Sequence, residues 1–159
     1  MYLACNLQVR VRFAPDALCD FDDFVVVQTE RESFPVPIEA RRQPPLLTLP
    51  STLDCGYCFA SGELSANFGA RNVGGAGRFI VLSKAAWEAG DHTVHQPLSV
   101  GAFELTPTFL DLQPGDHFRM NVKFAPSAST AYHASLVFLC DNCFLKEVQL
   151  TGAVTRTAT

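Results

Sequence analysis

Several hallmarks of membrane, nucleic-acid-binding and secreted proteins are missing from this sequence. No apolar run approaches the roughly 20 residues that a helix needs to cross a bilayer, so we expect no membrane association. The formal charge is −4, from 12 Lys plus Arg and 16 Asp plus Glu, and no basic stripe is present to follow a phosphate backbone, so we expect no nucleic-acid partner. Residues 1–5 lack the pattern of a signal peptide, and no N-x-S/T acceptor occurs. These absences predict a cytoplasmic protein.

The sequence also contains little that would support catalysis. Its four histidines are scattered, and the pair in "DHTVH", residues 91–95, has no third metal ligand nearby. No G-x-S-x-G and no H-E-x-x-H motif occurs. The glycine-rich run "GGAG", residues 74–77, precedes a strand pattern and opens no helix, which indicates a turn between strands and not a phosphate-binding loop. We therefore expect a protein that is not an enzyme and has no cofactor.

What the sequence does contain is alternation with a period of two residues. In residues 118–124 the apolar Phe118, Met120, Val122 and Phe124 alternate with polar side chains, which predicts a strand with one buried face. Similar patterns occur in residues 132–138 and 147–151 and in short segments further upstream. With 48% hydrophobic and 18% charged residues, the chain is typical of a packed globular protein. We predict an all-β, immunoglobulin-like Greek-key sandwich of seven or eight strands over residues 44–155.

Part of this pattern occurs twice. "FAP" at residues 13–15 aligns with "FAP" at residues 124–126, and the two motifs are separated by about the length of one sandwich domain. The upstream copy has strand patterns only at residues 7–13, 24–27 and 36–38. We therefore assign residues 1–43 to the final strands of a preceding, truncated sandwich and residues 156–159 to a tail. An apolar face without an opposing sheet would be exposed, so self-association through this half-domain is one expected way to cover it.

Residues 83–99 interrupt the strand pattern. Ser83 is a suitable N-cap and Gly90 a suitable stop for a helical turn. This segment is long enough to be a functional loop that presents Trp87 to a partner. The alternative is a connection between sheets in which Trp87 covers the core.

Six cysteines include two C-x-x-C pairs, Cys55 with Cys58 and Cys140 with Cys143, which lie far apart in the chain. Two such pairs are the usual ligands of a four-thiolate zinc site, so one interpretation is a site in which these four residues hold zinc. A redox pair is less compatible with the sequence, because redox C-x-x-C motifs open a helix and these lie in strand or turn patterns. In the remaining interpretation Cys140 and Cys143 only flank a tight Asp-Asn hairpin turn.

Three segments together resemble a known family. "LDCGYCFASGELSANFGARNVGGAGRF", "LQPGDHFRMNVKFAPSASTAYHASLVFLCDNC" and "EVQLTGAV" are similar to the ASH domain (abnormal-spindle and Hydin type), which is related to major sperm protein. The resemblance covers residues 46–154 and, in part, residues 7–42. It implies an immunoglobulin-like fold and a structural role in a cilium, flagellum or centrosome, including the sperm flagellum, with axonemal proteins or tubulin as partners. The family's usual Phe before Gly is Cys55 here, and its hairpin tip usually lacks the two cysteines.

A surface for such a partner would have to consist of local features, since the chain as a whole is acidic. The candidates are Trp87 and four arginines: Arg41, Arg42, Arg71 and Arg78. Charges of this kind are often only part of a solvated surface. Two other functions stay open at this point: a zinc-stabilised protein-binding module, and a secreted or periplasmic chaperone-like sandwich.

Overall fold

The computed structural model describes residues 8–155. The residues expected to form the tail, 156–159, lie outside this range. The described chain has one short helix, α1 (Lys84–Glu88), and eleven strands. In chain order the strands are β1 (Phe21–Gln28), β2 (Ser33–Ala40), β3 (Thr52–Phe59), β4 (Leu64–Arg71), β5 (Gly77–Ser83), β6 (Leu98–Val100), β7 (Phe103–Thr106), β8 (Phe109–Leu112), β9 (His117–Phe124), β10 (Ala131–Cys140) and β11 (Cys143–Thr155).

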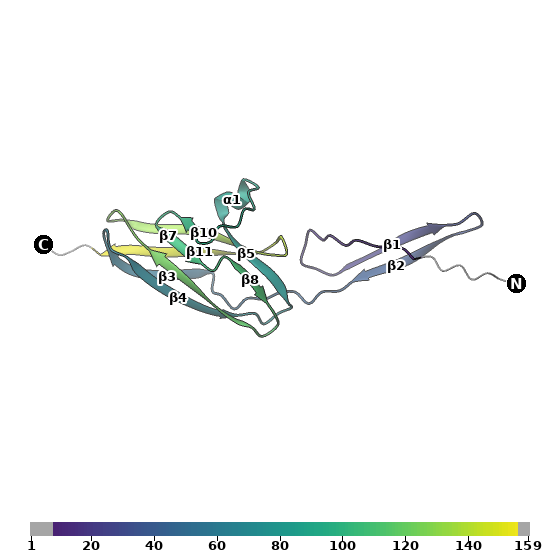
Figure 1. Ribbon diagram of the computed structural model, residues 1–159, viewed down its shortest axis with the longest axis horizontal. Coiled ribbons are helices and arrows are strands. Elements are labelled where there is room, and N and C mark those ends of the chain that lie inside the picture. The colour runs from purple at the N-terminus through teal and green to yellow at the C-terminus, as the bar shows by residue number, and fades with distance from the viewer. Residues whose placement is uncertain (1–7, 156–159) are drawn as a thin grey trace.

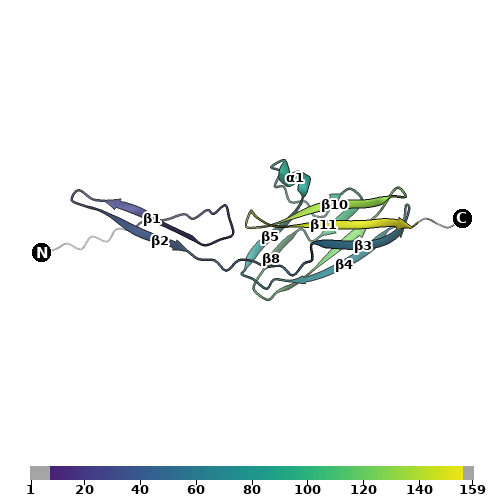
Figure 2. The same ribbon diagram turned by 180° about the vertical axis from the view of Figure 1, so that it is seen from behind.

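Nine of these strands form a two-layered sandwich. One sheet has the order β3-β11-β10-β5-β8 and the other has the order β4-β9-β7-β6. All neighbours are antiparallel except β3 and β11, which run parallel. Figures 1 and 2 show the two layers from opposite sides. The predicted all-β sandwich is thus confirmed, with nine strands where seven or eight were expected; one of them, β6, begins in the segment that we expected to be irregular.

The apolar residues of β9 form the centre of the core, as their alternation predicts. Phe118, Met120, Val122 and Phe124 are all buried. The Phe124 ring stacks on Phe103, with the ring centroids 4.9 Å apart, and meets the edge of Tyr132 at 5.5 Å. Such aromatic contacts add about 0.5 to 1.5 kcal/mol each to the energy of burial. This cluster joins β9 and β7 in one sheet to β10 in the other.

The connection from residue 43 to residue 46 packs tightly against the turn that follows β4. Gly75 donates its amide to the carbonyl of Pro44 at 2.9 Å, and Val73 donates to that of Leu46 at 2.8 Å. The buried Asn72 donates to the Gly75 carbonyl at 2.8 Å. A Cβ atom on Gly74 would fall against the backbone of Pro44 and Leu46. The glycines predicted to form a turn therefore also make room for this connection.

Strands β1 and β2 form a separate hairpin that extends from one end of the sandwich (Figures 1 and 2). The third upstream strand, expected at residues 7–13, is absent from residues 8–13, and residue 7 lies outside the described range. The repeat explains why residues 8–13 form no strand. Their downstream counterpart, β9, pairs with β4 and β7 in the four-stranded sheet. No counterparts of β4 and β7 precede residue 13 in the described chain.

The outer edge of β2 carries two prolines. Pro35 lies opposite Val26 and Pro37 opposite Phe24 in the hairpin. The amide of Phe24 donates to the Asp23 carboxylate at 2.8 Å, and a proline has no N–H to donate across the ladder, so we assign these as non-hydrogen-bonded pairs. The prolines therefore occupy positions whose amides would point away from β1, and they prevent a further strand from pairing with that edge, as the sequence predicts.

The predicted helical turn is confirmed as α1. The Ser83 hydroxyl accepts a hydrogen bond from the amide of Ala86 at 3.1 Å, and Gly90 follows with φ +73°. Trp87 packs on the outer face of the five-stranded sheet, against the small cluster of Leu82, Val137 and Leu139. It covers the sheet, in agreement with the second of the two interpretations.

Candidate protein-binding surface

The structure places the two cysteine pairs at opposite ends of the sandwich. Cys140 and Cys143 flank the turn between β10 and β11. Cys58 lies in β3 opposite Val154, near the other end of β11. At about 3.3 Å per residue, the stretch of β11 from Cys143 to Val154 spans roughly 35 Å. One tetrahedral site holding all four cysteines does not agree with this geometry, and residues 8–155 contain no group of three or more metal-ligating side chains that could hold a metal ion.

The pairing of β3 with β11 explains why the two cysteine pairs lie apart. The upstream C-x-x-C motif is itself part of β3, and β3 pairs in parallel with the second half of β11. A parallel partner begins and ends at the same ends of the sheet, so the upstream motif lies far from the hairpin tip.

Burial also affects the ionisation of two of these thiols. Burial raises the pKa of Cys140 to about 11, and the neighbouring Asp141 carboxylate adds to this effect, although Arg42 opposes it. Burial raises the pKa of Cys55 to about 11 as well, with a smaller contribution from Asp54. Both thiols are therefore protonated at neutral pH. The described cysteines are free, including Cys140 and Cys143, which the tight hairpin brings opposite each other.

Three of the four predicted arginines lie where the hairpin meets the sandwich, and each is paired with carboxylates. Arg41 binds Asp22 at 2.9 Å. Arg42 binds Asp141 at 2.5 Å, and Arg78 binds the other oxygen of Asp141 at 3.2 Å. Burial alone would raise the pKa of Asp141, but the hydrogen bonds from Arg42 and Arg78 outweigh it and lower the pKa. Of the three, Arg42 links the segment before the sandwich to the turn between β10 and β11, and all three offer little free charge to a partner.

Arg71 lies elsewhere, at the border of a hollow on the outer face of the four-stranded sheet. The hollow has a volume of about 490 Å³. It is lined by Thr48, Gly69, Ala70, Arg71, His117, Phe118 and Arg119. Arg71 lies opposite His117 in the ladder between β4 and β9, and Gly69 lies opposite Arg119. Because side chains alternate along a strand, all four of these residues belong to the outward face.

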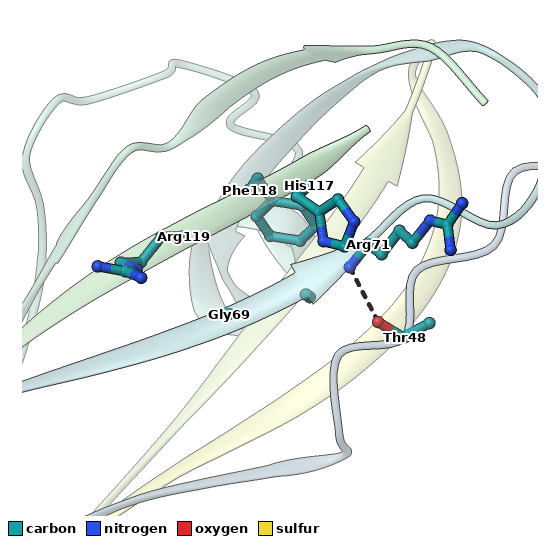
Figure 3. A pocket seen from close by; sticks show the side chains of 7 residues that line it. Thr48, Gly69, Arg71, His117, Phe118 and Arg119 are labelled. Atoms are coloured by element: carbon teal, nitrogen blue, oxygen red, sulfur yellow. Dashed lines mark hydrogen bonds between the residues drawn. The ribbon is translucent and has the colours of Figure 1, made fainter. Parts of the chain in front are cut away.

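The bottom of the hollow results from the absence of a side chain at Gly69. A Cβ atom at that position would have no neighbouring atom within 4 Å. Figure 3 shows Arg71 and Arg119 extending to opposite sides, with His117 between them. The amide of Arg71 donates to the Thr48 hydroxyl at 2.9 Å, and its side chain donates to the Gly115 carbonyl at 3.1 Å. These two hydrogen bonds fix the position of Arg71.

The positive charges around this hollow have no acidic partners in the described structure. The salt bridges found within residues 8–155 involve Arg41, Arg42, Arg78, Lys84 and Lys123. Arg71 and Arg119 are thus cations without a carboxylate partner in the described chain, and His117 lies between them (Figure 3). In an acidic chain, a local group of unpaired cations of this kind is suited to bind an anionic partner.

Sequence reasoning thus found Arg71 but missed its neighbours. His117 and Arg119 occupy the polar positions of β9, and the alternation that predicts its buried face could also have placed them together. Their proximity to Arg71 depends on the pairing of β9 with β4, which the sequence does not reveal. Trp87 lies on the other sheet, so the structure does not bring the predicted surface residues into one patch.

Comparisons with known proteins identify the fold and a relative. A human protein, Deleted in lung and esophageal cancer protein 1, is 37% identical over 154 residues, which cover 91% of this chain and 8% of that protein. The solved PapD-like domain 7 of human CEP192, an ASH/PapD-like domain, matches with a TM-score of 0.52 and 13% identity over 99% of both chains. The sandwich has the fold of an ASH/PapD-like domain. No family model matches the chain.

Two further facts complete the comparison. A weaker structural match, to the major sperm protein family member WR4 of C. elegans, has a TM-score of 0.43 at 7% identity over 70% of this chain and 97% of that one. The chain spans only 8% of the length of its human relative, so the activity and partners of that whole protein do not follow from the match. In the described part of the chain, no helix is long and apolar enough to cross a membrane.

Proposed function

We propose that this chain is a non-catalytic protein-interaction module of a cytoplasmic scaffold in a cilium, flagellum or centrosome, with axonemal proteins or tubulin as partners. The observation that carries this proposal is the extended homology to the human relative, together with the ASH/PapD-like fold. The unpaired cationic hollow supports it, because it is a surface with charge available to a partner. A role in the sperm flagellum is part of the same proposal.

Affinity purification tests this proposal. The tagged 159-residue chain is immobilised and exposed to a lysate of ciliated cells, and bound proteins are identified by mass spectrometry. We expect enrichment of axonemal proteins or tubulin over an unrelated β-sandwich of similar size and charge. Equal recovery of such proteins on both matrices would refute the proposal.

We also propose that β1 and β2 are the closing hairpin of a preceding sandwich. In the alignment of the two "FAP" motifs, Val25 corresponds to Leu136, which faces the core of the sandwich. Leu136 is 0% exposed, but Val25 is 44% exposed. The match to the human relative covers 91% of this chain. The part of the chain that this match does not cover is shorter than the segment before β1, so the match must extend into the hairpin. A longer protein that supplies the strands before residue 8 would cover this face.

The oligomeric state of the chain tests the alternative way of covering the hairpin. Sedimentation velocity of the 159-residue chain should show a monomer if the missing cover is an upstream sandwich. A dimer that is lost when Val25 is replaced by Lys would instead show that two copies cover each other's hairpins, and would refute the upstream assignment as the needed cover.

A further inference from the structure

Strand β4 is one of the two edge strands of the four-stranded sheet, and β6 is the other. Strand β4 pairs with β9 on one side, and its last residue shows which backbone groups point away from that partner. Arg71 accepts a hydrogen bond at its carbonyl from the amide of Thr48 at 3.0 Å, and its own amide donates to the Thr48 hydroxyl. The backbone N–H and C=O of Arg71 therefore point away from β9, and those of every second residue before it do so too.

Three residues consequently present unpaired backbone groups along this edge. They are Ser65, Asn67 and Gly69, which lie opposite Lys123, Asn121 and Arg119 of β9. The side-chain amide of Asn121 donates to the side-chain oxygen of Asn67 at 3.3 Å, which agrees with a closely spaced pair whose backbone groups are not bonded to each other. Within residues 8–155 no backbone partner occupies the outer side of these three residues. Such an edge can accept an additional strand.

The cationic hollow begins at this same edge. An added strand would place alternate side chains on the outward face of the sheet, beside Asn67, Gly69 and Arg71. Side chains at alternate positions repeat about every 6.8 Å, which equals the spacing of Gly69 and Arg71 along β4. Because Gly69 has no side chain, a group on the added strand can reach across it toward Arg119.

We propose that the edge of β4 from Ser65 to Gly69 binds an extended acidic peptide segment of a partner protein as an additional strand, with carboxylates at alternate positions against Arg71, His117 and Arg119. This inference rests on the proposed function as a protein-interaction module and names its site and the chemistry of its partner. Charge complementarity selects this occupant, because the edge supplies backbone hydrogen bonds and the adjoining face supplies unpaired cations in a chain of net charge −4.

Another edge of the described structure, that of β2, cannot pair with an additional strand in the same way. On β2, Pro35 and Pro37 remove the outward amides, so this edge is closed. At the far end of β4, Thr48 already occupies the outward groups of Arg71. The accessible stretch from Ser65 to Gly69 is therefore short, and the expected ligand is a short linear segment.

Peptide titration tests the proposal directly. The full chain is titrated into short fluorescein-labelled peptides in which Glu alternates with Thr, and binding is followed by fluorescence anisotropy. A Lys-Thr peptide of the same length is the charge control. We expect saturable binding of the Glu-Thr peptide that weakens as ionic strength rises, because the charges are exposed, and no binding of the Lys-Thr peptide. Equal binding of both peptides would overturn the proposal.

Two variants separate the site from general electrostatics. Arg119→Glu reverses a charge in the hollow and should weaken binding about 5- to 10-fold, as expected when an exposed charge pair is lost and replaced by repulsion. Arg31→Glu is the matched control, because Arg31 lies in the β1–β2 turn and its substitution changes the net charge equally. An equal loss for both variants would show that the site is not at the hollow.

Backbone pairing is tested on the peptide, so that no folding defect of the chain can interfere. N-methylation of every second amide removes the donors on one edge of the peptide strand. One of the two methylated series should lose binding at least about 10-fold and the other should keep it, because only one edge of the peptide faces β4. Equal effects of both series would refute strand addition. A dimer of the chain that forms through β4 without peptide would also refute it, by showing a second copy as the occupant.

Failure of this inference can be told apart from failure of the proposed function. If Arg119→Glu enriches the same ciliary partners from lysate as the unmodified chain, the interaction module stands and the β4 site is wrong. If neither protein enriches partners while the Glu-Thr peptide still binds at β4, the proposed function is wrong.

Discussion

Two phenylalanines at equivalent positions of the repeat allow a direct test of how the two parts of the chain are stabilised. Phe13 and Phe124 each open an "FAP" motif. Phe124 is 0% exposed and Phe13 is 55% exposed. Phe124 contacts the rings of Phe103 and Tyr132, whereas Phe13 meets the ring of Phe21 alone among the described aromatic residues, at a centroid distance of 5.2 Å. The same substitution should therefore have very different effects at the two sites.

Phe124→Ala should lower the free energy of unfolding by about 3 to 5 kcal/mol, the usual cost of removing a buried phenylalanine ring. At about 2 to 4 °C per kcal/mol for a chain of this size, the melting temperature should fall by about 6 to 20 °C. Phe13→Ala should cost no more than about 1 kcal/mol, since it loses one exposed aromatic contact. The pair thus predicts a difference of at least about 2 kcal/mol between equivalent residues.

Urea denaturation monitored by tryptophan fluorescence gives this comparison, because Trp87 is the only tryptophan in the chain and packs on the sandwich. Far-ultraviolet circular dichroism reports the whole chain in parallel. Equal destabilisation by the two substitutions would show that Phe13 belongs to a core of its own. The view of the upstream segment as an uncovered half of a sandwich would then fail.

Three further predictions concern the junction, the thiols and the linker. The two arginine partners of Asp141 lower its pKa in the folded chain. Its contribution to stability is therefore present above the unfolded pKa of about 3.9 and is lost as pH falls through the lower folded value. Asp141→Asn should flatten the dependence of the urea midpoint on pH below about 5, and an unchanged dependence would exclude this role. Iodoacetamide at about pH 8 should modify the exposed Cys19 well before the buried Cys140, whose pKa is about 11. Peptide mass spectrometry measures both rates, and equal rates would contradict the prediction. Gly74→Ala should lower the free energy of unfolding by about 1 to 3 kcal/mol, because the new Cβ atom meets the linker backbone. Gly69→Ala places its Cβ atom in open space and should lower it by less than about 1 kcal/mol. Comparable decreases in melting temperature for the two variants would refute the assigned packing.

Much of the sandwich could be predicted because the information is local. The alternation in β9 and the Asp-Asn turn between β10 and β11 each depend on neighbouring residues only. At this turn, Asp141 and Asn142 have φ values of 46° and 69°, which suit the tight hairpin that the sequence predicts. Local chemistry was sufficient for these elements.

The features that could not be predicted depend on pairing between distant strands. The parallel register of β3 with β11 separates the two cysteine pairs, and nothing near Cys55 or Cys143 indicates that register. The same limit applies to the candidate site, since Arg71 meets His117 only through the ladder of β4 with β9. Residues 8–13 show the opposite effect: they have a strand pattern and form no strand, because no partner strands are available to them in the described chain.

The tight connection at residues 43–46 has a mechanical consequence for any longer chain built from such domains. Hydrogen bonds from Val73 and Gly75 hold this segment along the sandwich, and Arg42 bonds to Asp141 just before it. Little slack is left between the hairpin and the sandwich. Successive domains joined in this way would resist bending and keep a constant spacing, so that a tandem array would be a stiff rod and not a flexible chain.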